Sequence, residues 1–469
     1  MQPVKSTSRR DFLKLAVAAA TSTAVVAACT QAAPTTTTVP ATVTEAPKPA
    51  PTPTVPAPTH VPVPPTPTTV AIPTAASLTP SPVPPTLGGI PKPAPTATTV
   101  PRASTGSATG GLAKLEEQVA SIMAAHHIPG LAVGLIRANQ LVYASGFGVR
   151  DVRTGAPMTE KSVMIMQSMS KAFTGAALLQ LAEGGKVDFA RRYLDYVPTF
   201  TMEDPRYKDI TLRHLLGHTS GLPQQVEREF YEGFLTPYYG PDASQLAVRS
   251  LAKGVTLLQD PGGQYFYYSN IGYDIMAELL RLVSGELFED YVQRHILAPL
   301  DMKDSTMLYP EVDPETLVAP HIYDNARNIV VWDYFPWDRR HTPSGGLFSN
   351  IVDFSQWVLM LMNGGVWRGQ TVLQPASQAF MWTPLSATPL FHQADGYNMG
   401  WQMGKDGDRE WKFTSGAAPG SQTVALVLPR EGLAAMAFSN LGGMSIYYDG
   451  YWPGDLCFWA LKQMLADVF

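Results

Sequence analysis

The distribution of proline along this chain of 469 residues limits where it can fold. Most of its 42 prolines lie before residue 104, and residues 30–111 consist almost entirely of Pro, Thr, Ala and Val. Such a segment has neither helical nor strand periodicity and too few large apolar side chains for a core. We expect a disordered tether, extended by roughly 3 Å per residue where it adopts the polyproline conformation. Folded structure is therefore expected in residues 112–469, which can bury a large core.

Residues 1–29 have the features of an export signal. Ser8 to Lys14 carry paired arginines, and the apolar run that follows, "LAVAAATSTAVVAAC", is too short to span a bilayer comfortably. The segment resembles a twin-arginine signal, and its "VAAC" ending places Cys29 where bacterial lipoproteins carry the thiol that is lipidated after cleavage. An ordinary signal peptide with an incidental cysteine is the alternative. Both interpretations predict an extracytoplasmic protein, and the first predicts a membrane anchor through lipid on Cys29.

Cysteine content and charge narrow the class of protein further. If Cys29 carries lipid, no second cysteine is left to form a disulfide with Cys457, so a disulfide framework is excluded for a monomer. A formal net charge of −5 gives no reason to expect nucleic acid or a strongly acidic partner. No segment after the signal is apolar enough for a transmembrane helix.

The start of the predicted domain alternates helix and strand patterns. A helical pattern begins at Leu112 and stops at Pro129-Gly130, and residues 131–148 predict an antiparallel hairpin. A third short apolar run, "SVMIMQS", precedes an Ala/Leu-rich helix closed by two glycines. We therefore expect a sheet edge to deliver Ser168 to a helix N-terminus, where backbone N–H groups favour developing negative charge.

Ser168 and Lys171 form a candidate nucleophile and base. Residues three apart share a helix face, so the Lys171 amine can approach the Ser168 hydroxyl. A lysine that is partly desolvated has a lowered pKa and can accept the serine proton. Alone the motif is weak, because Ser-x-x-Lys occurs by chance about once or twice in a chain of this length, and Lys171 could extend to solvent.

A second candidate pair follows about a hundred residues later in "YSN". Tyr268 and Asn270 stand near a helix start and could project into one cavity with Lys171. Tyr268 becomes a proton acceptor if a cation such as Lys171 stabilises its phenolate. An isolated Tyr-x-Asn is otherwise a turn beside an aromatic anchor.

The two motifs together resemble those of the serine β-lactamase and penicillin-binding protein superfamily, especially the branch of class C β-lactamases, D-Ala-D-Ala carboxypeptidases and related esterases. "SMSK" and "YSN" match in order with "ITLRHLLGHTSGLP", "PSGGLFSNIVDFSQWVLMLMNGG" and "GWQM". The resemblance implies an α/β (α+β) fold in which helices flank an antiparallel sheet, with a helical lobe at about residues 187–337. Together with the export signal, it implies an exported serine hydrolase that cleaves an ester or amide, such as a peptide or β-lactam, without a cofactor. The alternative is a non-catalytic or slowly deacylating penicillin-binding receptor.

The resemblance also implies roles for individual residues. Ser168 attacks the acyl carbonyl of a small-molecule or peptide substrate, and Lys171 and Tyr268 share the proton transfers. Asn270 orients Lys171 or the substrate amide. The backbone N–H groups of Ser168 and Ala417 form the oxyanion hole.

One expected element of the family is altered. Where the family has Lys or His, a variable residue and Gly on a strand lining the site, this chain has Thr414, Ser415 and Gly416. Thr414 supplies a neutral hydroxyl in place of the cation that is associated with substrate carboxylate recognition. Lys412 shares its strand face but is displaced by roughly 6–7 Å, so it is at best an imperfect substitute. This departure favours a substrate that lacks the carboxylate.

A metal site is disfavoured. His214 and His218 have the spacing of a metal-binding helix, but no acidic residue stands where the zinc protease motif needs one.

Overall fold

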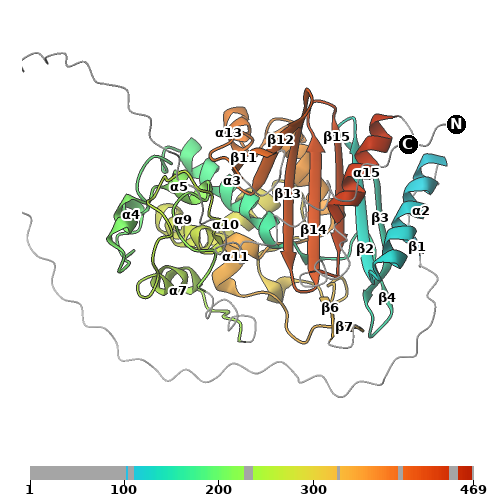
Figure 1. Cartoon of the computed structure of the whole chain (residues 1–469), viewed down its shortest axis with the longest axis horizontal. Helices are drawn as coiled ribbons and strands as arrows, with labels where there is room; N and C mark the ends of the chain where they lie inside the picture. The colour runs from blue at the N-terminus through green and yellow to red at the C-terminus, as the bar shows by residue number, and fades with distance from the viewer. Residues whose placement is uncertain are drawn as a thin grey trace, which may run out of the picture. The chain divides into compact units, whose positions relative to one another are not determined.

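The computed structural model describes residues 102–103, 110–226, 236–324, 328–388, 394–442 and 453–466 (Figure 1). The predicted signal, with Cys29, and nearly all of the predicted tether lie outside the described residues. No helix within the described ranges is long and apolar enough to cross a bilayer.

An antiparallel sheet joins the two ends of the folded region. Within the described residues it has nine strands in the order β1-β3-β2-β15-β14-β13-β12-β11, and β4 pairs with β3. Its strands are β1 (Arg102–Ala103), β2 (Gly130–Arg137), β3 (Gln140–Asp151), β4 (Ala156–Pro157), β11 (Ala394–Asn398), β12 (Trp401–Asp406), β13 (Arg409–Ala418), β14 (Ser421–Leu428) and β15 (Leu433–Ser439). The predicted hairpin is confirmed, because β2 and β3 pair across a two-residue turn in which Ala138 and Asn139 have φ values of 50° and 56°. Positive φ at both turn positions suits the right-handed twist of a hairpin.

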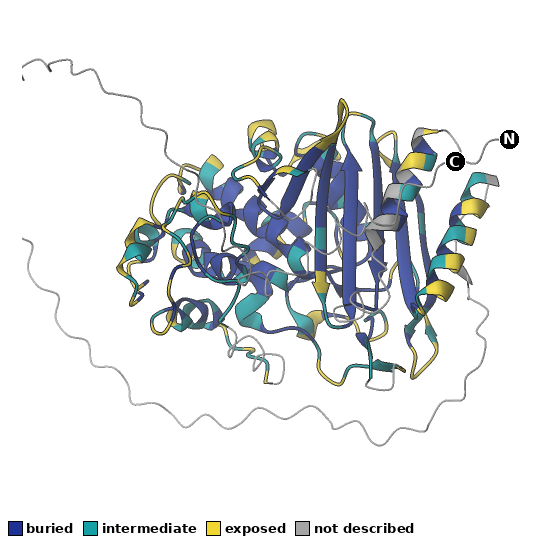
Figure 2. Ribbon diagram, viewed as in Figure 1, coloured by how far each residue is buried: buried dark blue, intermediate teal, exposed yellow. Residues whose placement is uncertain are grey.

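Alternation along the strands creates two hydrophobic cores, one on each face of the sheet. On one face Leu131 and Val133 pack with residues of α2 (Gly110–Ala125) and α15 (Pro453–Leu465). On the other face Ala132 and Met436 pack with Phe354 and Trp357 of α12 (Ile351–Met362). The strands at the centre are consequently buried along their length (Figure 2).

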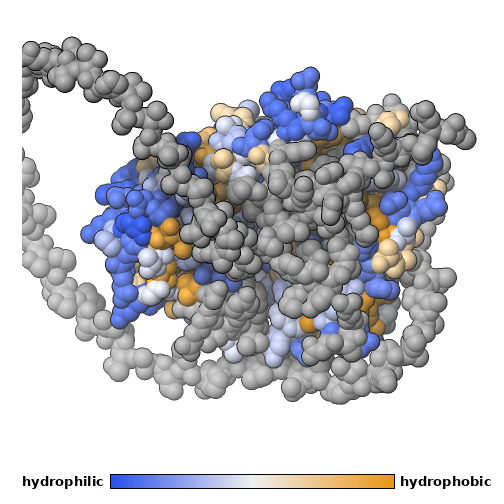
Figure 3. Space-filling model, in the orientation of Figure 1, coloured by the Kyte–Doolittle hydropathy of each residue, from blue (hydrophilic) through white to orange (hydrophobic). Residues whose placement is uncertain are grey.

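Helices and short elements dominate the region between β4 and β11, which contains the residue range of the predicted helical lobe (Figure 1). They are β5 (Met164–Ile165), η1 (Gln167–Met169), α3 (Ser170–Glu183), α4 (Tyr193–Tyr196), η2 (Pro205–Asp209), α5 (Leu212–Leu216), α7 (Ala243–Ser250), α8 (Asn270–Asp274), α9 (Met276–Ser284), α10 (Phe288–Val292), η3 (Gln293–Leu297), η4 (Tyr309–Glu311), β6 (His321–Tyr323), β7 (Ile329–Val331), η5 (Arg339–His341), α11 (Thr342–Gly345), β8 (Phe348–Ser349), α12, β9 (Val366–Trp367), β10 (Gln370–Thr371) and α13 (Pro375–Met381). Hydrophilic residues cover much of the visible outer surface of this lobe (Figure 3). The fold class predicted from the resemblance is confirmed.

Four local predictions need correction. Helix α2 starts at Gly110 and ends at Ala125, short of the predicted stop at Pro129, and Arg102–Ala103 of the predicted tether pairs with β3. The strand before Ser168 is not part of the main sheet, because β5 pairs only with β8 in a separate two-stranded sheet. Ser168 itself lies in the 3₁₀ turn η1, and α3 begins two residues later.

Candidate active site

The turn that carries Ser168 is held in an uncommon backbone conformation. Gln167 is buried with a φ of 51°, a region that non-glycine residues seldom occupy and that costs of order 1 kcal/mol or more. The hydroxyl of Ser170 donates to the Gln167 carbonyl at 2.6 Å and accepts from the backbone N–H of Leu347 at 2.9 Å. These bonds fix the turn, so the partly exposed Ser168 is presented in one orientation.

Lys171 is fully buried and contacts three oxygen atoms. Its Nζ lies 3.2 Å from Ser168 Oγ, 2.8 Å from Asn270 Oδ1 and 2.8 Å from the carbonyl oxygen of Ser344. The side-chain oxygen of Asn270 and the carbonyl of Ser344 can only accept hydrogen bonds. A neutral amine therefore donates its two hydrogens to them and directs its lone pair at the hydroxyl of Ser168. The predicted approach of Lys171 to Ser168 is confirmed, and its extension to solvent is excluded.

Burial also prepares Lys171 for this role. Desolvation lowers the pKa of Lys171 to about 7, against an opposing contribution from the Asp274 carboxylate, which raises the pKa. Near neutral pH a large fraction of the amine is then unprotonated. An amine with a pKa near the working pH is suited to general-base catalysis.

Tyr268 joins the same cluster, but its state differs from the expected one. Its ring centroid lies 4.8 Å from the Nζ of Lys171, and its hydroxyl is hydrogen-bonded with Ser168. Burial raises the pKa of Tyr268 well above its ordinary value, Asp274 adds to this effect, and the bond with Ser168 only partly opposes it. The expectation of a phenolate stabilised by Lys171 is therefore wrong, because burial outweighs any help from the cation. Tyr268 is a neutral phenol next to the Ser168 hydroxyl.

The altered strand element faces the same turn. A Cβ added at Gly416 would overlap the carbonyl oxygen of Met166, so only glycine lets β13 approach η1 this closely. Thr414 stands two residues earlier and shares this strand face. It is 1% exposed, and within the described residues its hydroxyl has no hydrogen-bond partner. Ala417 is exposed at the end of β13, and its backbone N–H remains the predicted second donor of an oxyanion hole.

Lys412 does not replace the missing cation. Its amine donates to the carbonyl of Trp382 at 3.4 Å and lies 4.0 Å from the Glu410 carboxylate. Burial lowers the pKa of Lys412, while Glu410 partly opposes the shift. The partners of this side chain therefore lie outside the cluster around Ser168.

His218 supports the site in a way that its sequence spacing did not indicate. Its Nδ1 accepts from the backbone N–H of Ser269 at 3.0 Å, and its ring centroid lies 4.4 Å from that of Tyr268. Desolvation, with a smaller contribution from Lys171, lowers the pKa of His218 well below its ordinary value. The neutral ring thus anchors the segment that carries Tyr268 and Asn270.

His214 is engaged elsewhere, in a capping box with Thr211 at the start of α5. Across the described ranges no group of three or more His, Cys, Asp or Glu residues could hold a metal ion.

A buried pair of an aspartate and a histidine was also missed in the sequence. The carboxylate of Asp274 lies 2.7 Å from Nδ1 of His341 and accepts from the backbone N–H of Ser344 at 3.2 Å. Asp274 stands four residues after Asn270 in α8. An acidic residue one helical turn after the Tyr-x-Asn motif was therefore the sequence signal that could have identified it.

Comparison with known proteins places this geometry in a family. A family model described as Beta-lactamase matches residues 115–447. Penicillin-binding protein 4 of Amycolatopsis lactamdurans is 26% identical over 344 residues, which cover 70% of this chain and 87% of that protein. Protein flp of Staphylococcus aureus (strain MW2) is 25% identical over 317 residues, or 67% of this chain, and these span only 60% of that protein.

Solved structures of related proteins have the same fold. The octameric penicillin-binding protein homologue from Pyrococcus abyssi superposes with a TM-score of 0.65 at 25% identity, covering 76% of this chain and 77% of that one. D-amino acid amidase from Ochrobactrum anthropi SV3 shares the fold, with a TM-score of 0.61 at 21% identity over 75% of this chain and 99% of that one. The family match spans most of the described residues and includes Ser168, Lys171 and Tyr268, and the chain belongs to the Beta-lactamase family, within the superfamily of serine β-lactamases and penicillin-binding proteins.

Proposed function

We propose that this protein is an exported serine hydrolase that cleaves an ester or amide through an acyl-enzyme on Ser168. The observation that carries the proposal is the buried Lys171 amine, 3.2 Å from Ser168 Oγ, whose other two oxygen neighbours accept hydrogen bonds only. This arrangement directs an amine with a pKa of about 7 at a serine hydroxyl, which is what activation of that nucleophile needs.

The proposed reaction proceeds in two acyl-transfer steps. Ser168 Oγ bonds to the substrate carbonyl carbon as its proton passes to Lys171, and the backbone N–H groups of Ser168 and Ala417 stabilise the oxyanion. The bond to the alcohol or amine leaving group then breaks, and the leaving group takes the proton from Lys171 through the neutral phenol of Tyr268. Water next adds to the acyl carbon and gives a proton to Lys171. The bond between this carbon and Ser168 Oγ then breaks, Oγ takes the proton from Lys171, and the acid leaves.

The neutral side chain of Thr414 favours substrates that have no carboxylate at the position that the family cation would contact. The hydroxyl of Thr414 is neutral and buried, and the nearby cation of Lys412 is held by Trp382 and Glu410. A substrate carboxylate there would lose water without gaining an ionic partner. Esters and primary amides avoid this cost, and the amidase that shares the fold is by its name an enzyme that acts on an amide.

An acyl-substrate panel tests the proposal. Nitrocefin, D-Ala-D-Ala peptides, p-nitrophenyl esters and amino acid amides are incubated with the wild type and with Ser168→Ala. We expect hydrolysis of at least one ester or amide, and its loss in Ser168→Ala. Ser284→Ala is the matched control, because the hydroxyl of Ser284 contacts the carbonyls of Leu280 and Glu286 and the backbone N–H of Glu286 within the lobe. Activity that survives in Ser168→Ala contradicts the proposal.

Labelling separates the hydrolase from the receptor that Thr414 also suggests. A fluorescent penicillin that labels Ser168 transiently, or a fluorophosphonate that labels it stably, supports a hydrolase. Stable labelling by the penicillin without turnover of any substrate supports a slowly deacylating receptor, and no labelling supports a non-catalytic scaffold.

We also propose that the protein lies outside the cytoplasm and is anchored to the membrane by a lipid on Cys29. Its support is the composition of residues 1–29 and the long Pro/Thr-rich segment that follows. Metabolic labelling with a fatty acid should mark the wild type but not Cys29→Ser, and label retained in the variant would exclude lipidation at that residue.

A further inference from the structure

The buried pair Asp274–His341 is joined to Lys171 through a single residue. One oxygen of the Asp274 carboxylate lies 2.7 Å from His341 Nδ1, and the other accepts from the N–H of Ser344 at 3.2 Å. The carbonyl of the same Ser344 accepts from the Lys171 amine at 2.8 Å. Asp274 and Lys171 are both 0% exposed, so solvent screens their charges little.

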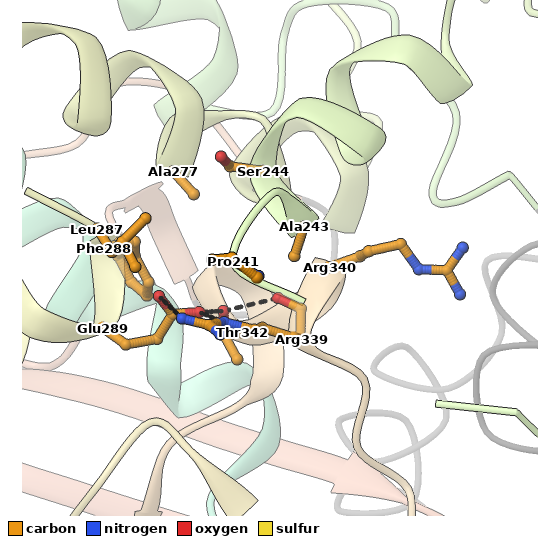
Figure 4. A pocket seen from close by; sticks show the side chains of 10 residues that line it. All are labelled: Pro241, Ala243, Ser244, Ala277, Leu287, Phe288, Glu289, Arg339, Arg340 and Thr342. Carbon is orange, nitrogen blue, oxygen red and sulfur yellow. Dashed lines mark hydrogen bonds and ion pairs between the residues drawn. The ribbon is translucent and has the colours of Figure 1, made fainter. Parts of the chain in front are cut away.

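The segment that carries His341 is fixed on both sides. Arg339 pairs with Glu289 at 3.0 Å, Arg340 pairs with Asp338 at 2.9 Å, and the hydroxyl of Thr342 donates to Glu289 at 3.2 Å. Figure 4 shows the hollow beside this segment, where Glu289, Arg339 and Thr342 converge. These contacts fix the residues on both sides of His341 and so hold its ring against Asp274.

The charges around the pair favour an imidazolium facing a carboxylate. Burial alone lowers the pKa of His341, but the charge and hydrogen bond of Asp274 more than offset this, so the pKa is raised; Asp338 adds to the rise and Arg340 opposes it. Asp274 in turn faces Lys171 and Tyr268, whose pKa values it raises. Glu289 and Arg339 form a neutral pair.

We propose that Asp274 and His341 are positioning residues that hold Ser344 against the Lys171 amine and balance the charge that this amine faces. The carboxylate of Asp274 raises the pKa of Lys171, and its contact with His341 places a group that can carry positive charge beside that carboxylate. The two side chains therefore shift the pKa of the Lys171 amine in opposite directions. Their importance for acyl transfer rests on the proposed function, whereas their effect on Lys171 does not.

Two near-isosteric variants test these opposed effects. Asp274→Asn keeps an oxygen to accept from Ser344 and an amide to face Nδ1 of a neutral His341, but it removes the negative charge. His341→Asn keeps a donor near Asp274 and removes the positive charge. Asp353→Asn is the matched control, because Asp353 is also buried and bonded to a backbone N–H and a hydroxyl, those of Asp304 and Ser305.

The measurement is the titration of Lys171 by NMR in the full chain labelled with ¹³Cε-lysine, with the Lys171 signal assigned by its loss in Lys171→Met. We expect the midpoint to fall by about one pH unit in Asp274→Asn and to rise by about one unit in His341→Asn. Asp353→Asn should leave it unchanged. If Asp274→Asn does not fold, the upward shift in His341→Asn decides the question alone.

Unchanged midpoints, or shifts in the same direction, overturn the inference, since a merely structural role gives no opposed pair of shifts. The titration is read without substrate, so this failure is distinct from failure of the proposed function. Opposed shifts in a protein that hydrolyses nothing and is not labelled at Ser168 would retain the inference about Lys171 and refute the hydrolase.

Discussion

The side-chain oxygen of Asn270 lies 2.8 Å from the amine of Lys171, although the two residues stand 99 positions apart in the chain. Asn270 is the first residue of α8, and Lys171 is in the first turn of α3. The contact therefore joins the first turns of two helices, of which α3 begins two residues after Ser168. It also makes Asn270 the place where the charge beside the candidate base can be changed with little change in shape.

Asn270→Asp should shift the pH dependence of acylation upward. A carboxylate at 2.8 Å favours the protonated amine and raises the pKa of Lys171 by about one unit or more. The rate near pH 7 should fall about tenfold and recover at higher pH. The rate at which a fluorophosphonate phosphonylates Ser168, which needs the same activated hydroxyl, measures this when it is followed against pH. Asn270→Ala is the comparison, because it should lower the rate without recovery; an unmoved midpoint in Asn270→Asp would contradict the assignment of Lys171 as base.

Tyr268→Phe should lower the rate of acylation at every pH without moving the midpoint of the acidic limb. That midpoint is expected near the Lys171 pKa of about 7, whereas burial raises the pKa of Tyr268 far above this range. The pH profile of kcat/KM for the best ester checks the prediction. Tyr267→Phe, on the neighbouring residue, should behave as the wild type. A midpoint displaced in Tyr268→Phe would make the phenol part of the titrating base.

Lys171 should make stability depend on pH above neutrality. Burial lowers its pKa in the folded state to about 7. In the unfolded chain the pKa is about 10.4, so between these values the unfolded state binds more protons. The contribution of Lys171 to the free energy of unfolding is thus complete above the unfolded pKa and is lost as pH falls towards 7. The expected slope of the unfolding free energy is at most about 1.4 kcal/mol per pH unit.

Denaturant titration of the wild type and Lys171→Met from about pH 6 to about pH 9.5 isolates the contribution of Lys171 to the unfolding free energy. The difference in unfolding free energy should rise with pH in favour of the wild type above pH 7 and be flat below it. A difference that is flat throughout would mean that Lys171 keeps an ordinary pKa in the folded protein.

The sequence predicted the residues that cluster around Lys171 and Ser168 because they belong to short motifs whose chemistry is local. Lys171 follows Ser168 by one helical turn, and Tyr268 and Asn270 stand together in "YSN". Asp274 and His341 were not predicted, because their contact joins residues 67 positions apart and neither lies in a motif. The direction of the Lys412 amine depends on the distant carbonyl of Trp382, which no strand pattern reveals.

The electrostatic state of Tyr268 was mispredicted for a related reason. Proximity to Lys171 follows from the motifs, but the extent of burial depends on how many chain segments close over the ring. His218 and Tyr397 come from distant segments, and their rings lie 4.4 Å and 6.5 Å from that of Tyr268. Desolvation by such neighbours then decides the sign of the pKa shift.

Gly416→Ala should disrupt both stability and acylation. The added Cβ would overlap the Met166 carbonyl oxygen, so β13 must move away from the turn that holds Ser168. Overpacking of this kind costs about 1–3 kcal/mol. Thermal unfolding and labelling of Ser168 measure the two effects. Gly184→Ala is the control, because nothing lies closer than 3.6 Å to the added methyl and its φ is −77°; equal effects in both variants would contradict the close approach of β13.

Thr414→Val and Thr414→His test the altered strand element from two sides. Within the described residues the Thr414 hydroxyl is buried without a partner, so its replacement by an isosteric methyl should raise the unfolding free energy by about 1 kcal/mol. Hydrolysis of a neutral ester should persist in Thr414→Val. Thr414→His restores a group that can carry positive charge on the face of β13 towards Ser168. It should raise kcat/KM for a carboxylate-bearing acyl substrate relative to its methyl ester about tenfold. The two substrates are compared at a pH where the new histidine is protonated. Selectivity that is the same in Thr414→His and the wild type would show that the missing cation does not set the substrate class.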